Sequence, residues 1–181
     1  MIAIFSDTHS ESGHELVGDA LHAAREADAV IHAGDFTSTA ALEGFQEVCG
    51  ALHAVHGNAD SPAVCDRLPP ARTVEAGGVR FAVTHRRDGG ETGLAMFGRS
   101  RGADVVVSGH SHRPAIVETD DVLLLNPGSH ADPRGNRPGF AVLEGNGKRA
   151  TNESGDLAGE LREPDGTVLE TFAVPMRDDR S

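Results

Sequence analysis

The segment Ile2–Asp7, IAIFSD, begins with a short apolar run and ends in polar residues. An uninterrupted apolar run of this length is typical of a buried β-strand. The same pattern returns in Ala29–Asp35, AVIHAGD, and in Leu52–Asn58, LHAVHGN. Between these segments, residues 13–27 and 38–48 carry apolar side chains at helical spacing, which predicts two amphipathic helices. This alternation of strands and helices predicts a parallel sheet with right-handed crossovers.

The second half of the chain has a different pattern. Residues 72–75 and 79–84 are joined by Gly77-Gly78, and residues 115–119 and 122–125 form a similar pair, so two hairpins are expected. The other expected elements are a helix at 91–101, strands at 104–107, 140–143 and 168–174, and an exposed loop or irregular hairpin at 145–166. A parallel first half and a hairpin-rich second half predict an α/β fold of two packed mixed β-sheets flanked by helices.

Length and composition limit the class of protein. The chain has 181 residues, which favours one domain, expected over 1–175 with a frayed tail at 176–181. No apolar run reaches the roughly 18 residues that a membrane helix needs, and the first residues do not resemble a signal peptide. Cys49 and Cys65 form no CxxC pair and are interpreted as reduced thiols. We therefore expect a cytoplasmic protein with no membrane partner.

The charge balance is strongly acidic. Sixteen Lys and Arg stand against 28 Asp and Glu, which gives a formal net charge of −12, and Lys148 is the one lysine. Self-repulsion of this kind is screened by concentrated salt, so the composition favours a halophilic protein. An ordinary acidic protein from a GC-rich genome is the alternative. The same charge disfavours binding to duplex nucleic acid.

Side chains of metal-ligand type follow the ends of five expected strands. They are Asp7 and His9, then Asp35, then Asn58 with Asp60, then His85, then His110 with His112. Ligands bind at the carboxyl ends of strands in open α/β sheets, so the fold would gather these residues at one edge. In an extended loop, residues two apart point the same way, so Asp7 with His9, and His110 with His112, would each face one site.

The chemistry of this set favours borderline divalent metals. Setting Asp60 aside, it offers two carboxylates, one amide oxygen and four imidazoles. Such a mixture suits manganese, iron, cobalt, nickel or zinc better than calcium or magnesium alone. Seven ligands are too many for one ion. If Asp35 bridges, they divide into two shells of four.

The order of these motifs resembles that of a known family. Asp-x-His at 7–9, Gly-Asp at 34–35, Gly-Asn-x-Asp at 57–60, the lone His85 and Gly-His-x-His at 109–112 resemble the calcineurin-like metallophosphoesterase superfamily. Asn126-Pro-Gly-Ser129, followed by Pro133-Arg134, is most similar to its small YfcE-type phosphodiesterase branch. The resemblance covers residues 1–143 and implies a two-sheet sandwich flanked by helices.

The resemblance implies a role for each residue. The first metal would be held by Asp7, His9, Asp35 and His112, and the second by Asp35, Asn58, His85 and His110. Mn²⁺ is the metal expected first, with Ni²⁺, Fe²⁺, Co²⁺ or Zn²⁺ as alternatives. A hydroxide bridging the two metals would attack the phosphorus of a small phosphate-ester substrate in line. The expected catalytic residues are Asp35, Asn58, Asp60 and His85, and Asp60 could instead orient one of the metal ligands from behind it.

Several positions leave alternatives open. Ala59 stands where larger relatives have a His that assists the leaving group, so we expect a preference for good leaving groups. Arg86 and Arg87 follow His85, where the family usually has Gly; they either clamp a phosphate or face solvent. Asn126–Ser129 is expected to form a turn, and His130, which follows it, is a weaker candidate for reaching the metal site. His32 and His56 lie just before motif residues, and they either support the ligands, pack in the interior or face solvent.

These observations favour a dinuclear-metal phosphodiesterase. A phosphomonoesterase or a nucleotide pyrophosphatase would use the same site with a different pocket. A non-catalytic protein-interaction scaffold is the alternative from another class, since the superfamily includes one in the retromer vacuolar-sorting subunit. The complete set of expected ligands favours the enzyme. Homo-oligomers are common, so we expect a homodimer.

Overall fold

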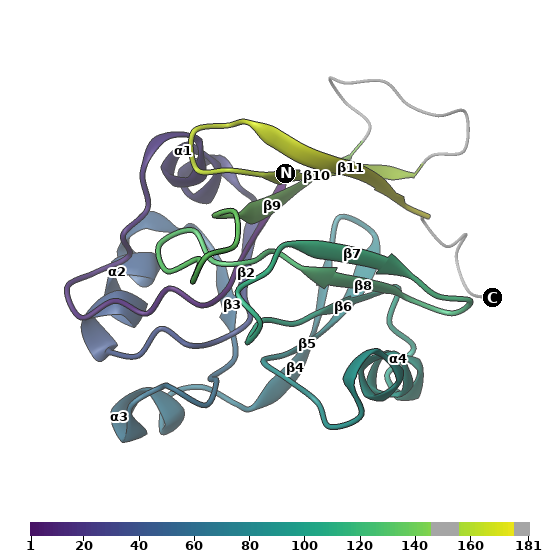
Figure 1. Ribbon diagram of the computed structural model, residues 1–181, viewed down its shortest axis with the longest axis horizontal. Coiled ribbons are helices and arrows are strands. Elements are labelled where there is room, and N and C mark those ends of the chain that lie inside the picture. Colours follow the sequence, from purple (N-terminus) through teal and green to yellow (C-terminus); the bar gives the residue numbers. More distant parts are fainter. Residues whose placement is uncertain (146–155, 176–181) are drawn as a thin grey trace.

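The computed structural model describes residues 1–145 and 156–175 of the chain (Figure 1). Within these residues, two mixed β-sheets pack together and helices flank them, which confirms the predicted fold class. The tail expected at 176–181, and residues 146–155 of the expected loop, lie outside the described residues. No helix in the described part of the chain is long and apolar enough to span a membrane.

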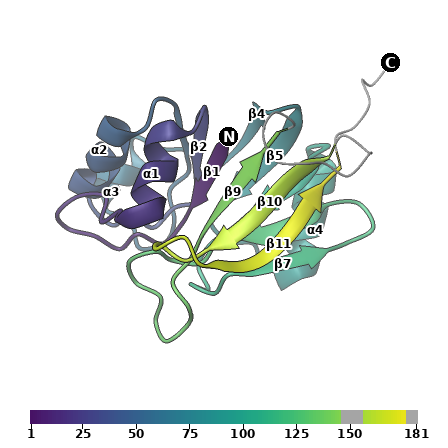
Figure 2. The same cartoon turned by 90° about the horizontal axis from the view of Figure 1, so that it is seen from above.

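The larger sheet has six strands in the order β11-β10-β9-β1-β2-β3. Their bounds are β1 Ile2–Phe5, β2 Ala29–His32, β3 Leu52–Ala54, β9 Phe140–Glu144, β10 Leu157–Arg162 and β11 Val168–Val174. β1, β2 and β3 pair in parallel, as the alternating strands and helices predict, whereas β9, β10 and β11 extend the sheet by antiparallel pairing. The helices α1 Gly18–Glu26, α2 Thr39–Val48 and α3 Pro62–Cys65 lie on its outer side (Figure 2).

The smaller sheet has five strands in the order β4-β5-β6-β8-β7. Their bounds are β4 Ala71–Ala76, β5 Val79–Thr84, β6 Val105–Val107, β7 Ala115–Glu118 and β8 Leu123–Asn126. The pairs β4–β5 and β7–β8 are antiparallel, at the two predicted hairpins, and β5, β6 and β8 run in parallel. Helix α4, Gly90–Ser100, packs on the outer face of this sheet.

Strand β1 shows why the apolar runs are uninterrupted. Ile2 and Ile4 belong to the core between the two sheets, whereas Ala3 and Phe5 belong to the core beneath α1 and α2. Successive side chains of a strand point to opposite faces, so a strand covered on both faces is apolar at every position.

Three elements differ from the sequence-based expectation. Helix α1 begins at Gly18 rather than at residue 13, because Gly13 and Glu15 have positive φ and break the helical backbone before it. The short helix α3 was not expected. Of the two alternatives for residues 145–166, the exposed loop is wrong for β10, whereas its antiparallel pairing with β11, which contains a register shift at Leu161 and Arg162, agrees with an irregular hairpin.

Candidate metal centre

The candidate ligands come from the carboxyl ends of strands in both sheets. Asp7 and His9 follow β1, and Asp35 follows β2, in the larger sheet. His85 follows β5, and the loop with His112 follows β6, in the smaller sheet. The two parallel strand groups therefore deliver their ends to one place across the sandwich, as the rule for open α/β sheets predicts.

Three imidazoles direct their Nε2 atoms toward two buried carboxylates. Nε2 of His85 and Nε2 of His9 lie 3.2 and 3.3 Å from the same oxygen, Oδ2 of Asp35. Nε2 of His112 lies 3.4 Å from Oδ1 of Asp7. Two groups of ligand atoms result, each within 4.8 Å: Asp7, His9 and His112, and Asp7, Asp35 and His85. Asp7 is common to both groups, and Asp35 lies between His9 and His85.

The protonation of two imidazoles follows from their other ring nitrogens. Nδ1 of His85 is 2.8 Å from the carbonyl of Ala33, and Nδ1 of His112 contacts the carbonyl of Asp132. A carbonyl only accepts, so in the neutral ring Nδ1 carries the proton and Nε2 presents a lone pair. Within the described part of the chain, Nε2 of His9 and Nε2 of His85 are buried without a hydrogen-bond partner. A divalent cation between these nitrogens and the carboxylates would satisfy both, so the donor set fits a metal.

The charges of this cluster are strongly coupled. Burial opposes ionisation of Asp35, yet contacts with His85 and His9 hold the pKa of Asp35 well below its usual range. Burial raises the pKa of Asp7, although His85, the Ser6 hydroxyl and His112 act in the opposite direction. Burial lowers the pKa of His85, but Asp35 and Asp7 outweigh it and raise the pKa overall. The cluster therefore stabilises positive charge between the two carboxylates.

Five of the candidate ligands have left-handed backbone conformations. Their φ angles are 53° for Asp7, 47° for His9, 61° for Asp35, 72° for His110 and 57° for His112. Positive φ is uncommon for residues other than Gly, and such strained positions cluster at functional sites. The expectation of extended loops is therefore wrong. One consequence is that His112 is buried while His110, two residues before it, is exposed.

Three predicted site residues lie outside the two ligand groups. His110 and Asn58 are exposed, and the ring of His110 lies 5.3 Å from that of His85, centroid to centroid. Asp60 accepts hydrogen bonds from the backbone N–H groups of Asp35, Thr37 and Gly57 at 2.7–3.0 Å. Its carboxylate thus joins the loop after β2 to the loop after β3 and holds Asp35 in place.

The loop after β8 supports the centre from the other side. The hydroxyl of Ser129 donates to the carbonyl of Asp7 at 2.6 Å and accepts from the N–H of Asp132 at 2.8 Å. The same loop brings Nη2 of Arg134 within 3.4 Å of Nδ1 of His9. The sequence predicts a turn at Asn126–Ser129 with a structural role near the metals, and the Pro133-Arg134 motif marks the segment that follows. The contacts of Asp132 and Arg134 are not evident from the sequence.

The other histidines near the motifs have separate roles. Nδ1 of His32 accepts from the N–H of Gly34, so its Nε2 donates to the hydroxyl of Thr8, 2.8 Å away. Thr8 lies between two candidate ligands, so His32 supports that loop from the core. His130 lies in the core between Phe5 and Phe45, and its Nε2 donates to the carbonyl of His14.

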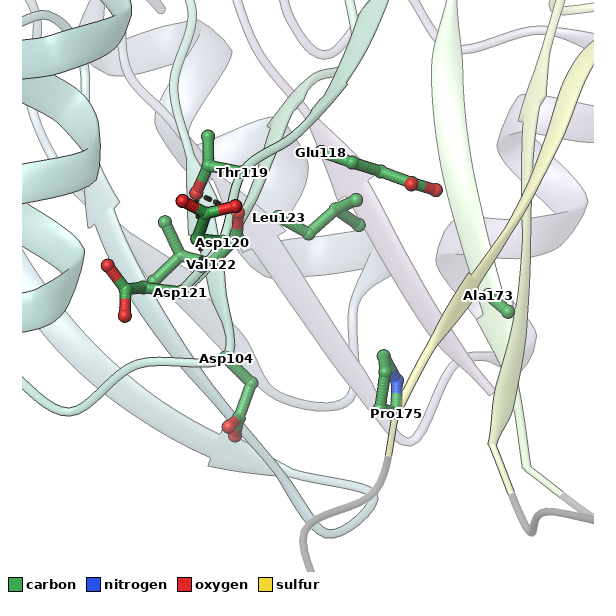
Figure 3. Close-up of a pocket in the computed structure, with 9 residues that line it drawn as sticks. All are labelled: Asp104, Glu118, Thr119, Asp120, Asp121, Val122, Leu123, Ala173 and Pro175. Carbon is green, nitrogen blue, oxygen red and sulfur yellow. Dashed lines mark hydrogen bonds between the residues drawn. The ribbon is translucent and has the colours of Figure 1, made fainter.

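A separate cavity lies at the opposite end of the smaller sheet. It has a volume of about 400 Å³ and is lined by Asp104, by the turn from Glu118 to Leu123, and by Ala173 and Pro175 (Figure 3). Asp104 and Leu123 stand at the amino ends of β6 and β8, away from the candidate ligands. Among the described residues, its lining contains four carboxylates and no imidazole, so it does not offer the mixed ligands of the metal centre.

Comparison with known proteins by sequence and by structure points to phosphoesterases and to proteins of the same fold. The family model described as a calcineurin-like phosphoesterase superfamily domain matches residues 1–148. A probable metallophosphoesterase of Methanothermobacter thermautotrophicus is 34% identical, over 84% of this chain and 90% of that protein. A phosphodiesterase of Methanocaldococcus jannaschii is 29% identical over 70% of this chain and 82% of its own length. The solved structure of Entamoeba histolytica Vps29 with Zn²⁺ has a TM-score of 0.72 at 19% identity, covering 97% of this chain and 99% of that one.

Proposed function

The chain belongs to the calcineurin-like phosphoesterase superfamily, and on that premise we propose that it is a phosphodiesterase that uses two divalent cations. One observation carries the proposal: three imidazole Nε2 atoms and two buried carboxylates converge, and two of those nitrogens have no hydrogen-bond partner within the described residues. Buried polar atoms without partners are rare in proteins, and a cation accounts for both.

The residues of the site fall into two groups: those that would bind the cations, and those that position these ligands. Asp7, His9, Asp35, His85 and His112 would hold the two cations, with Asn58 and His110 completing the exposed side. Cations bound there would polarise phosphate oxygens and lower the pKa of a water molecule toward neutrality.

The supporting contacts fix the positions of these ligands. The carbonyls of Ala33 and Asp132 keep the Nε2 atoms of His85 and His112 free to bind a cation. Asp60 and Ser129 fix the backbones of Asp35 and Asp7 through hydrogen bonds. We therefore assign Asp60 a positioning role.

The metal and the leaving group follow from the same residues. Three imidazoles with two carboxylates suit Mn²⁺, Fe²⁺, Co²⁺, Ni²⁺ or Zn²⁺, and we propose Mn²⁺ first. Ala59 is exposed beside Asn58 and has no group that donates a proton. The preferred substrates are therefore esters whose leaving group departs as an anion, such as aryl phosphodiesters.

The test compares a diester with a monoester. Metal-stripped protein in high salt receives Mn²⁺, Ni²⁺ or Mg²⁺, and hydrolysis of bis-p-nitrophenyl phosphate and p-nitrophenyl phosphate is followed. We expect metal-dependent cleavage that is faster for the diester than for the monoester. The variants His112→Ala and Asp35→Asn should lose this cleavage. His22→Ala, at an exposed position of α1, is the matched control and should retain activity. Calorimetric titration with Mn²⁺ shows whether each variant has lost metal binding as well.

The same experiment separates the rival functions. Faster cleavage of the monoester would move the assignment to a phosphomonoesterase. Cleavage of a nucleoside diphosphate but of neither nitrophenyl ester would identify a pyrophosphatase. Binding of Mn²⁺ without turnover of any ester would favour a protein-interaction scaffold. The similarity of the fold to that of Vps29 is the reason to include this outcome in the test.

A further inference from the structure

A small cavity opens beside the metal centre, on the side of His85. Its volume is about 230 Å³. Asn58 and His85 line it from the metal centre, and His56, Arg86 and Arg87 line it farther out. Pockets that enclose a whole drug-sized ligand have volumes of roughly 300–1,000 Å³, so this cavity has room for one part of a substrate.

The charge of the cavity is opposite to that of the whole chain. The formal net charge of the chain is −12, yet among the described residues that line the cavity none is acidic. Arg67, Arg80 and Arg162 each pair with a carboxylate. Neither Arg86 nor Arg87 forms an ion pair with any carboxylate of the described residues. Two guanidinium groups in an acidic protein are thus left available to an anion from solution.

The two arginines are placed differently. The guanidinium of Arg87 lies over the ring of Phe97 in α4, 4.2 Å from its centroid, and this contact holds the side chain in place. Arg86 lines the same cavity directly beside His85, the candidate ligand that precedes it in the chain. The cationic side of the cavity therefore continues directly from the candidate ligands.

We propose that this cavity binds a second phosphate group, carried on one ester arm of the substrate, through Arg86 and Arg87. The inference rests on the proposed phosphodiesterase activity, which places the scissile phosphate at the metal centre. A phosphate monoester carries a charge of about −1.5 to −2 near neutral pH, which matches two guanidinium groups. Arginine also binds phosphate through two parallel hydrogen bonds, which gives direction as well as charge.

The test measures binding rather than turnover. Mn²⁺-loaded protein is titrated calorimetrically with the bisphosphates of ethanediol, propanediol and butanediol. Ethyl, propyl and butyl phosphate serve as the matched ligands that lack the second phosphate. We expect at least one bisphosphate to bind about tenfold more tightly than its monophosphate, since a charge-assisted hydrogen bond contributes about that factor. Arg86→Ala should abolish this preference, and Arg86→Lys should retain part of it.

A charge-matched control separates the cavity from general electrostatics. Arg25→Ala removes the same charge from the exposed end of α1 and should keep the full preference. Equal binding of both ligand classes by the unaltered protein, or an unchanged preference in Arg86→Ala, would overturn the proposal. Loss of the preference in Arg25→Ala would also overturn it, because the effect would then reflect net charge alone. Hydrolysis of bis-p-nitrophenyl phosphate, measured on the same preparation, reports separately whether the proposed function holds.

Discussion

Gly109 shows how closely single residues are packed around the metal centre. A Cβ at this position would overlap the hydroxyl of Ser6 and lie 2.6 Å from Oδ2 of Asp7. These two groups are hydrogen-bonded to each other, and the next residue, His110, donates its N–H to Asp7. Any side chain at residue 109 must therefore displace Asp7.

We predict that Gly109→Ala lowers the affinity for Mn²⁺ at least about tenfold, because displaced supporting groups cost metal sites about that factor. Calorimetric titration measures the affinity. Gly50→Ala is the control, because a Cβ at Gly50 would meet nothing within 4 Å. Unchanged affinity in Gly109→Ala would contradict the prediction that packing against Gly109 positions Asp7 for the metal.

His130 makes stability depend on pH from within the core. Burial lowers the pKa of His130 to about 4, against about 6.5 in an unfolded chain. Between these values the unfolded chain binds the proton and the folded one does not, so stability is lost as the pH falls below about 6.5. For the values given, the free energy of unfolding should fall by about 2 kcal/mol between about pH 7 and pH 5 from this residue.

The variant His130→Gln isolates this contribution. It removes the titrating ring and keeps an N–H that reaches toward the carbonyl of His14. Urea unfolding with EDTA at each pH should show a smaller pH-dependent loss in the variant than in the unaltered protein. Equal losses would mean that His130 has the same pKa in the folded protein as in the unfolded chain.

At the scale of single residues, the sequence predicts which residues belong to the metal centre better than it predicts where their side chains point. Asp7, His9, Asp35, His85 and His112 could be found because parallel strands end together, a rule that needs only strand positions. The exposure of His110 depends on a backbone angle that its sequence does not encode. The hydrogen bond of Ser129 to Asp7 crosses 122 residues of chain, and no local pattern predicts a contact of that range.

At the scale of elements, β10 shows why one strand was missed. It contains Gly159, Glu160 and Arg162, residue types that are poor or indifferent in strands. The ring of Phe172 on β11 lies over Gly159, at the place where a Cβ would stand. Pairing with an aromatic residue on the neighbouring strand thus compensates for the missing side chain, and this depends on a partner outside the segment.

We predict that Leu161→Ala in β10 lowers the free energy of unfolding by about 2–5 kcal/mol, because it leaves a cavity in a packed core. Leu161 is 1% exposed and belongs to the core between the sheets. Val168→Ala on β11 is the control, since Val168 is 48% exposed and should change stability by less than about 0.5 kcal/mol. Chemical denaturation measures both. A loss below about 1 kcal/mol for Leu161→Ala would mean that this hairpin contributes little to the fold.

At the scale of the molecule, the metal centre depends on both sheets. Asp7 and Asp35 follow strands of the larger sheet, and His85 and His112 follow strands of the smaller one. The relative position of the two sheets therefore sets the distances among the ligands. The sequence predicts that two sheets form, from the alternation and the hairpins. It does not predict their relative placement, which results from side chains of many strands packing in one core.

The net charge of −12 makes the stability of the whole molecule depend on salt. Charges of one sign repel in the compact state, and the distance over which they act falls from about 10 Å at 0.1 M salt to about 3 Å at 1 M. We predict that the free energy of unfolding rises from 0.1 to 1 M KCl by about 1 kcal/mol or more. KCl is used because sulfate would also strengthen apolar burial.

Replacing exposed Glu26 and Glu47 by Lys reduces the excess of negative charge by about a third, so the salt-dependent rise in the free energy of unfolding should be smaller in that variant. An equal rise in both proteins would assign the effect to apolar burial instead of to charge repulsion.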